Sequence, residues 1–219
     1  MWRLLLTCWL FLFAVGCTPP SSPILLSTQV VPLSLQGSDV SLRVDLPPGW
    51  HGYVDGTHLL LTDVQNPLGA DGRLNGVVVN MWLPDPELLT PVATEGPVRT
   101  SDVLQQIVTR PALLGDAVAS TPQPFTYSDF DGAYYVLLSD NETLTLVFAL
   151  TPANASQMVA FNVTSQGRTI TSLLDTLRRV LPFIQVNGTP LDETLLDTLP
   201  PPDLPTPRAQ TAQQPTGAP

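Results

Sequence analysis

The chain has 219 residues, long enough for one domain of ordinary size with tails. Charged residues make up 13 %, the formal net charge is −10, and all nine basic residues are Arg because the chain contains no Lys. The missing Lys excludes a Walker A loop and Schiff-base catalysis. The acidic balance argues against a nucleic acid partner, whose phosphates need a basic face.

The N-terminus predicts a signal peptide over residues 1–16. Arg3 is followed by thirteen uncharged residues that end at Gly16. A helix of that length rises about 20 Å, whereas the hydrocarbon core of a bilayer is about 30 Å thick. The segment therefore fits a signal peptide better than a membrane span.

Cys17 follows directly, and the small residues before it, Ala14-Val15-Gly16, are similar to the lipobox of bacterial lipoproteins. This resemblance implies that Cys17 is lipidated, which palmitate would label, and that it becomes the first residue of the mature chain. Its acyl chains would hold the protein on the extracytoplasmic face of the cell membrane, in the cell envelope. The alternatives are ordinary cleavage nearby, or retention of the segment as an anchor, with Cys17 an unused thiol.

A second location of the protein stays open. Four Asn-x-Ser/Thr triplets, at Asn141, Asn154, Asn162 and Asn187, fit the N-glycosylation pattern and would suit a eukaryotic secreted protein. In either location the mature chain has no intramolecular disulfide, because the remaining Cys8 lies inside the signal.

Strand patterns dominate the mature chain. Residues 17–37 are predicted to hold the lipidated Cys and a flexible tether. Apolar and polar residues then alternate up to Pro47-Pro48-Gly49, as in a strand with one buried face. Asp55-Gly56 predicts the two-residue loop of a hairpin. The strands expected in this half cover residues 40–46, 50–54, 57–64 and 74–83.

The second half predicts a meander between two helices. One helix begins near Thr100 and ends at Pro111, and the other begins at Thr169 and ends at Pro182. Short turns, Asp131-Gly132 among them, join four successive strands, which must therefore be antiparallel. These strands are expected at residues 125–130, 133–139, 142–150 and 157–164.

The C-terminal part predicts two further segments. Residues 185–199 hold a short helix, with Thr189 as N-cap and Pro190 in the first turn. Residues 200–219 form a Pro-rich tail with few large apolar side chains, which predicts disorder.

The Pro47-Pro48-Gly49-Trp50 step, together with this order of elements, resembles the PsbP/Mog1-like family over residues 38–184. The resemblance implies an α+β fold with a central antiparallel sheet of about six or seven strands and helices on both faces. Members serve mainly as binding or assembly factors, which implies a module without catalytic activity and with an unknown envelope partner. No ligand cluster here matches the metal sites of photosynthetic members, so no cofactor is expected.

The two histidines lie in the predicted hairpin. If Asp55-Gly56 is its loop, Tyr53 faces His58 and His51 faces Leu60, so the histidines become diagonal neighbours about 7 to 8 Å apart. That spacing would allow a shared metal ion. No carboxylate of the hairpin lies on the same face as a third ligand. Two polar residues on a solvated face are therefore preferred, and a metal-binding envelope protein is the alternative.

No catalytic residue is predicted. The chain contains no Gly-x-Ser-x-Gly, His-Glu-x-x-His or Gly-x-Gly-x-x-Gly motif. Asp55, Asp71 and Asp131 each precede Gly, which is typical of turns. An extracytoplasmic hydrolase with a triad from distant segments is the least favoured alternative.

Two further expectations concern the surface. The segment from Pro84 to Pro97, with four prolines among acids, predicts a long loop suited to partner contacts. Tyr134 and Tyr135 point to opposite faces of one strand, which predicts that one of them is exposed.

Overall fold

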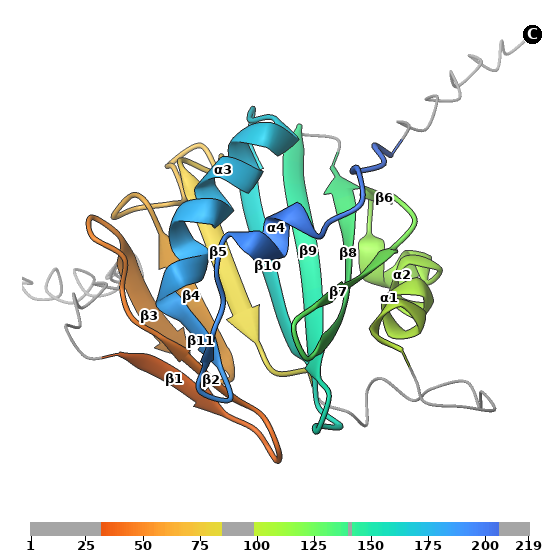
Figure 1. Ribbon diagram of the computed structural model, residues 1–219. Coiled ribbons are helices and arrows are strands. Elements are labelled where there is room, and N and C mark those ends of the chain that lie inside the picture. Colours follow the sequence, from red (N-terminus) through yellow and green to blue (C-terminus); the bar gives the residue numbers. More distant parts are fainter. Residues whose placement is uncertain (1–31, 85–98, 140–141, 206–219) are drawn as a thin grey trace, which may run out of the picture.

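A computed structural model describes residues 32–84, 99–139 and 142–205 (Figure 1). The predicted signal peptide, Cys17, most of the tether, the loop expected at residues 84–97 beyond its first residue, and residues 206–219 of the tail lie outside the described residues. Within the described ranges, no helix is both long and apolar enough to cross a membrane.

The main sheet is antiparallel throughout and has eight strands. Seven of them follow the order β3-β4-β5-β10-β9-β8-β6, and β7 also pairs with β8. The predicted meander is confirmed, because β7 to β10 pair in succession. The strands are β3 (His51–Asp55), β4 (His58–Thr62), β5 (Val77–Trp82), β6 (Val118–Ala119), β7 (Gln123–Tyr127), β8 (Phe130–Leu138), β9 (Thr143–Pro152) and β10 (Val159–Gln166).

A second, four-stranded sheet joins the two ends of the domain. Its order is β1-β2-β11-β12, and it packs against one face of the main sheet, in front of β3 and β4 in Figure 1. The expected strand at residues 40–46 belongs to this sheet instead of the central one. The strands are β1 (Leu33–Gln36), β2 (Ser41–Val44), β11 (Ile184–Val186) and β12 (Thr189–Pro190).

The helices lie on both faces of the main sheet. The predicted helices are confirmed as α1 (Thr100–Val108) and α3 (Ile170–Val180), and the Thr169 hydroxyl caps α3 by accepting from the Ser172 N–H at 3.3 Å. Pro111 does more than end α1, because it also starts α2 (Pro111–Leu114). A 3-10 helix (Leu181–Phe183) and α4 (Thr194–Asp197) complete the set within the described ranges.

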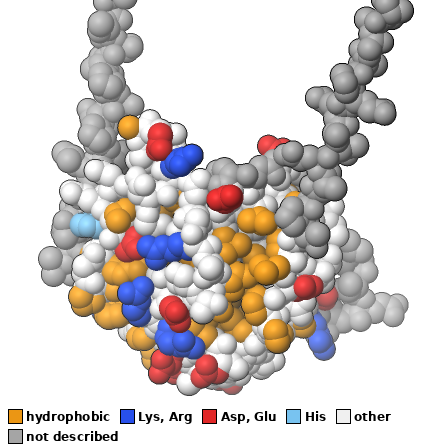
Figure 2. All heavy atoms as spheres, turned by 90° about the horizontal axis from the view of Figure 1, so that it is seen from above, with side chains coloured by type: hydrophobic (Ala, Val, Ile, Leu, Met, Phe, Trp, Pro, Cys, Tyr) orange, Lys and Arg blue, Asp and Glu red, His pale blue; other side chains and the backbone are white. Residues whose placement is uncertain are grey.

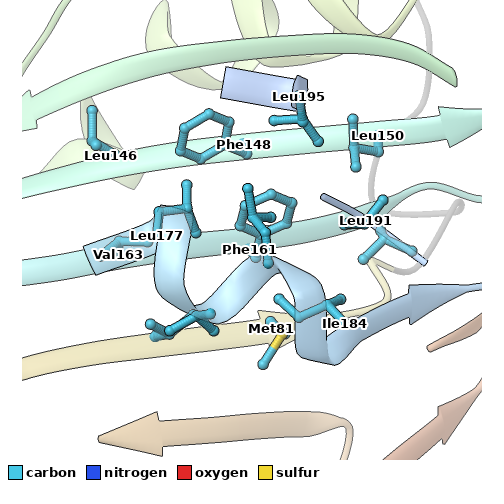
Figure 3. Packing of buried hydrophobic residues seen from close by; sticks show 14 of the residues in the cluster. Met81, Leu146, Phe148, Leu150, Phe161, Val163, Leu177, Ile184, Leu191 and Leu195 are labelled. Carbon is cyan, nitrogen blue, oxygen red and sulfur yellow. The ribbon is translucent and has the colours of Figure 1, made fainter. Parts of the chain in front are cut away.

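The larger core lies between the main sheet and the layer made of α3, α4 and the second sheet. Figure 3 shows Phe148 and Phe161 at its centre, facing Leu177 and Leu195. The two rings stack with centroids 5.0 Å apart. Burial of so many apolar side chains is the main stabilising contribution here, since the described residues include no Cys that could form a disulfide.

A smaller core lies under α1 on the opposite face. There Val103 and Leu104 pack against Tyr135 and Val147 of the sheet. The expected α+β architecture, with a central antiparallel sheet flanked by helices, is thus confirmed. The prediction that Tyr134 or Tyr135 is exposed is wrong, because both faces of β8 are covered and the two residues are only 2 % and 4 % exposed.

Two predicted boundaries need correction at the ends of the domain. The tether expected to reach residue 37 ends earlier, because β1 begins at Leu33, which is 3 % exposed. Residue 200, where the tail is expected to begin, still contacts the domain, because the Tyr134 hydroxyl donates to the Pro200 carbonyl. β1 has only four residues, too few for its alternation to stand out in the sequence.

The C-terminal helix also begins later than predicted. Thr189 and Pro190 form β12, and α4 begins at Thr194. The Asp192 carboxylate accepts from the Thr194 N–H at 2.9 Å and also from its hydroxyl. These bonds lower the pKa of Asp192. The residue that makes this turn, Asp192, lies two residues beyond Pro190, which was expected in the first turn of the helix.

Candidate functional site

The β3–β4 hairpin is shifted by one residue from the prediction. Asp55 pairs with His58, so the loop is Gly56-Thr57 instead of Asp55-Gly56. Gly56 has φ +57° at the first loop position, whereas Thr57 has no positive φ. A Gly-x loop of that kind fits a type II′ turn, whereas Asp-Gly predicts type I′.

This shift separates the two histidines. His51 pairs with Thr62 and His58 with Asp55, so the two histidines are four residue positions, or about 13 Å, apart along the hairpin. Both still lie on one face of the hairpin, as predicted, but the expectation that they are diagonal neighbours is wrong. The two imidazoles therefore do not face a shared ion. The described ranges contain no group of three or more potential metal-ligating side chains.

His58 has structural partners. Its Nδ1 lies 3.2 Å from Oδ1 of Asn80, and its ring stacks on Trp82 with centroids 5.9 Å apart. Among the described residues, neither His51 nor His58 has a Ser, Asp or Glu side chain within hydrogen-bonding distance. This arrangement provides no nucleophile and base pair of the kind that a hydrolase needs.

The acidic residues are mainly structural. Asp71 lies in a turn as predicted, where its carboxylate accepts from the Arg73 N–H at 3.1 Å. The turn predicted at Asp131-Gly132 is wrong, because both residues lie in β8. The Asp131 carboxylate instead accepts from the Thr100 N–H at 2.7 Å, at the start of α1.

Four of the described arginines, Arg43, Arg73, Arg168 and Arg178, lie in ion pairs with acidic side chains. Arg178 of α3 lies 3.6 to 3.7 Å from carboxylate oxygens of Asp175, Glu193 and Asp197, which connects α3 to the α4 region. Figure 2 shows basic side chains separated from one another by acidic and hydrophobic ones. The face seen in Figure 2 therefore carries no continuous patch of one charge.

A cavity of about 450 Å³ lies between β1 and the tip of the β3–β4 hairpin. One wall comes from β1 and the turn after it, and the other from the main sheet. None of the described residues that line it is charged. The lining residues are Ser34, Leu35, Gln36, Gly37, Val54, Gly56, Thr57, Leu83 and Gln157.

Hydrogen bonds fix the two walls to each other. The Gln157 side chain, on the main sheet side, accepts from the Ser38 N–H at 3.0 Å. The Asp39 carboxylate accepts from the Ser156 N–H at 2.6 Å and from the Gln157 N–H at 3.2 Å, which lowers the pKa of Asp39. Gly37 allows this close approach, since a Cβ there would lie 1.9 Å from Gln157 Oε1 and would displace the amide. The cavity is therefore preformed.

Val54 marks the open side of the cavity. It is 47 % exposed, although its cross-strand neighbour Leu59 is fully buried. The alternation of β3 predicts a core-facing side chain here, and Val54 does point to that face. It stays exposed because the second sheet covers Gly52 but stops short of the hairpin tip.

Local sequence patterns do not reveal this cavity, because its walls come from four separate segments. Of the segments that line it, the sequence pattern indicates only the β3–β4 hairpin. The arrangement provides apolar contact surface together with the hydroxyl and amide groups of Ser34, Gln36 and Thr57. Such a lining suits an uncharged, partly apolar group.

No protein-family model matches this chain, and no curated protein matches it. Among solved structures, the chain is structurally similar to one described as a mutant of the protein Mog1. The two are 11 % identical, the alignment covers 75 % of this chain and 97 % of that chain, and the TM-score is 0.40. At this identity the likeness concerns the fold alone, and no residue role is transferred.

Proposed function

We propose that this protein is a lipid-anchored, extracytoplasmic binding or assembly module without catalytic activity. The observation that carries the proposal is the preformed cavity between β1 and the β3–β4 hairpin, whose described lining residues are uncharged and where Val54 is exposed at the open side. Its volume lies in the range of sites that bind small ligands or protruding side chains.

The lining favours binding over catalysis. Ser34 and Thr57 provide the hydroxyl groups, but among the described residues no His, Asp or Glu lines the cavity to act as a general base. An unactivated hydroxyl is a weak nucleophile near neutral pH. The site is therefore suited to hold a partner by contact and hydrogen bonding.

Lipidation of Cys17 would place this site close to a membrane. The described domain begins at residue 32, so the preceding chain spans at most about 50 Å when fully extended. Two or more acyl chains anchor a protein stably, whereas one chain binds only marginally. Without Arg3 the lipidated chain would hold 8 Arg against 19 acidic residues, and this net charge of −11 adds repulsion from anionic lipid head groups, which favours a partner that reaches the domain from the envelope space.

The anchor is tested by metabolic labelling with palmitate in a bacterial host. The wild-type protein should take up label and fractionate with membranes, and Cys17→Ala should take up none. Label that enters Cys17→Ala at the wild-type level would remove the anchor from the proposal.

The binding site is tested by placing a photoreactive amino acid at Thr57, which is exposed and lines the cavity. Irradiation of cells should give a discrete adduct of higher mass. The matched control places the same group at Leu113 of α2, which is 60 % exposed and belongs to neither wall of the cavity. Identical adducts from both positions, or none from Thr57, would contradict a binding role for the cavity.

A further inference from the structure

We propose that Asn75 is a site of spontaneous deamidation to aspartate and isoaspartate, and that the fold protects Asn187 from the same reaction. Both residues are followed by Gly, and no other Asn of the chain is. Because Gly has no Cβ, its nitrogen reaches the preceding Asn side chain with the least steric hindrance. By sequence the two sites should react alike, whereas the structure distinguishes them. The inference is independent of the proposed binding function.

The reaction needs only water and the two residues of the dipeptide. Hydroxide removes the proton of the Gly76 N–H, and the nitrogen bonds to Cγ of Asn75. The bond between Cγ and Nδ2 then breaks, and Nδ2 takes a proton from water and leaves as ammonia. Water next opens the succinimide ring at one of its two carbonyls. Opening at Cγ gives aspartate, and opening at the main-chain carbonyl gives isoaspartate, in which the chain runs through Cβ and Cγ.

The Asn75 side chain has the freedom that this ring closure requires. Asn75 is exposed in the loop between β4 and β5 (Figure 1), where its own N–H donates to the Pro67 carbonyl at 2.7 Å. Among the described residues, none forms a hydrogen bond with its side-chain amide or accepts from the Gly76 N–H. The amide can therefore turn toward the Gly76 nitrogen without breaking a hydrogen bond within the described structure.

The Asn187 side chain, in contrast, is held at both of its polar atoms. Oδ1 accepts from the Ser41 N–H at 2.7 Å and from the Ser41 hydroxyl at 3.3 Å, and Nδ2 donates to the Asp39 carbonyl at 3.2 Å. The Asn187 N–H also donates to the Ser41 carbonyl at 2.9 Å. Ring closure at Asn187 would have to break all three side-chain bonds, which connect the β11–β12 loop to the start of β2.

Deamidation of Asn75 would change both the charge and the length of the β4–β5 loop. The new carboxylate joins those of Asp71 and Glu142, which line the same hollow. Isoaspartate also adds a methylene group to the main chain directly before Gly76. Space is limited there, since a Cβ at Gly76 would clash with Oδ1 of Asp63, which accepts from the Val77 N–H at 2.6 Å. The modification therefore acts on the contact that begins β5.

The test follows the folded, full-length protein during incubation in mildly alkaline buffer. Trypsin cleaves after Arg, so residues 74–99 and 180–208 form separate peptides, each with one Asn-Gly. Mass spectrometry, with fragmentation to locate the change, should show deamidation at Asn75 about tenfold or more faster than at Asn187, because hydrogen bonds hold the latter. Equal rates, or a faster reaction at Asn187, would overturn the proposal.

The same incubation in guanidinium chloride separates the effect of the fold from that of the sequence. Unfolding releases the Asn187 side chain, so its deamidation should accelerate about tenfold or more and approach the rate at Asn75. The rate at Asn75 should change little. A difference between the two sites that persists in the denaturant would overturn protection by the fold, and an equally large acceleration of Asn75 would overturn its assignment as an open site.

Variants identify the residue that becomes isoaspartate. An isoaspartate-specific methyltransferase should label the incubated, folded protein, and Asn75→Gln should remove most of the label, because Gln would have to close a larger ring. The fold should persist, since the main-chain bond to Pro67 remains. Asn154→Gln is the matched control and should keep the wild-type label, because Asn154 is also exposed but precedes Ala. Full label in Asn75→Gln, as isomerised Asp71 would give, would overturn the assignment.

Discussion

Gly132 shows how one missing side chain decides where an aromatic ring can lie. It sits in β8 directly opposite Phe125 of β7, and a Cβ at this position would lie 2.5 Å from ring atoms of Phe125. The sequence signal Asp-Gly predicted a turn here, because glycine is common in turns. Glycine in a strand instead marks a close approach, which only the packing partner reveals.

Gly132→Ala should lower the free energy of unfolding by about 1 to 3 kcal/mol, because the added methyl group displaces the buried Phe125 ring. Urea denaturation followed by circular dichroism measures this change. Phe125→Leu in the same chain should reduce the penalty of the alanine, since the two sites are in contact and couple. Additive effects of the two substitutions would contradict the packing.

At the scale of elements, α1 is capped by a neighbouring strand as well as by its own first turn, where the Asp102 carboxylate accepts from the Arg99 N–H at 3.4 Å. The Asp131 carboxylate of β8 accepts from the Thr100 N–H, and the Thr100 hydroxyl donates to the Asp131 carbonyl at 2.9 Å. This hydroxyl also lies 2.8 Å from that of Thr151 in β9. The cap fixes α1 over the smaller core and uses the negative charge that a helix N-terminus favours.

Asp131→Ala should destabilise the protein by about 1 to 2 kcal/mol, the usual loss for an N-terminal cap. Urea denaturation again provides the measurement. Asp71→Ala serves as the control, because that carboxylate accepts one bond in an exposed turn and its loss should have a much smaller effect. Equal effects of the two substitutions would show that the contact with Thr100 contributes little.

The elements that sequence reasoning predicted correctly carry local signals. The meander follows from alternation and short turns, and α3 follows from helical spacing and the Thr169 cap. The second sheet could not be predicted in this way, since β2 pairs with β11 from the other end of the domain. The predicted arrangement of the two histidines is wrong for a smaller reason. One residue of register at Gly56 was enough to separate His51 from His58, because register sets every cross-strand pair.

At the scale of the whole molecule, the tyrosine side chains share an altered titration at alkaline pH. All four tyrosines have a raised pKa, with burial as the largest cause in each. Burial raises the pKa of Tyr135 to about 12. The chain has no Lys, so tyrosine is the side chain with an ordinary pKa near 10. Alkaline stability therefore reports on the two cores, into which Tyr134 and Tyr135 point from opposite faces of β8.

The direction in which stability changes with pH follows from the coupling of proton binding to unfolding. A phenol with a higher pKa in the folded state holds its proton when folded and loses it on unfolding, so its contribution to stability is complete below pH 10 and is lost as the pH rises to about 12. The urea midpoint should therefore be level from pH 8 to about 9.5 and fall above pH 10.

Tyr135→Phe should make the fall in the free energy of unfolding between pH 10 and pH 12 smaller by about 2 kcal/mol. Tyr53→Phe is the control and should flatten it less, because Tyr53 is only half-buried. If Tyr135→Phe left the fall unchanged, the titration of Tyr135 would not control alkaline stability.

The pairing of β2 with β11 also sets an order of events during synthesis. A ribosome makes the N-terminal strand first, at roughly 5 to 20 residues per second, so β2 waits on the order of ten seconds before β11 exists. Until then the inner edge of β2 is open, and Leu42 and Val44, fully buried in the finished domain, have no cover. The newly made chain is therefore most vulnerable to aggregation before residues 184–186 emerge, and a chaperone that shields β2 would act in this interval.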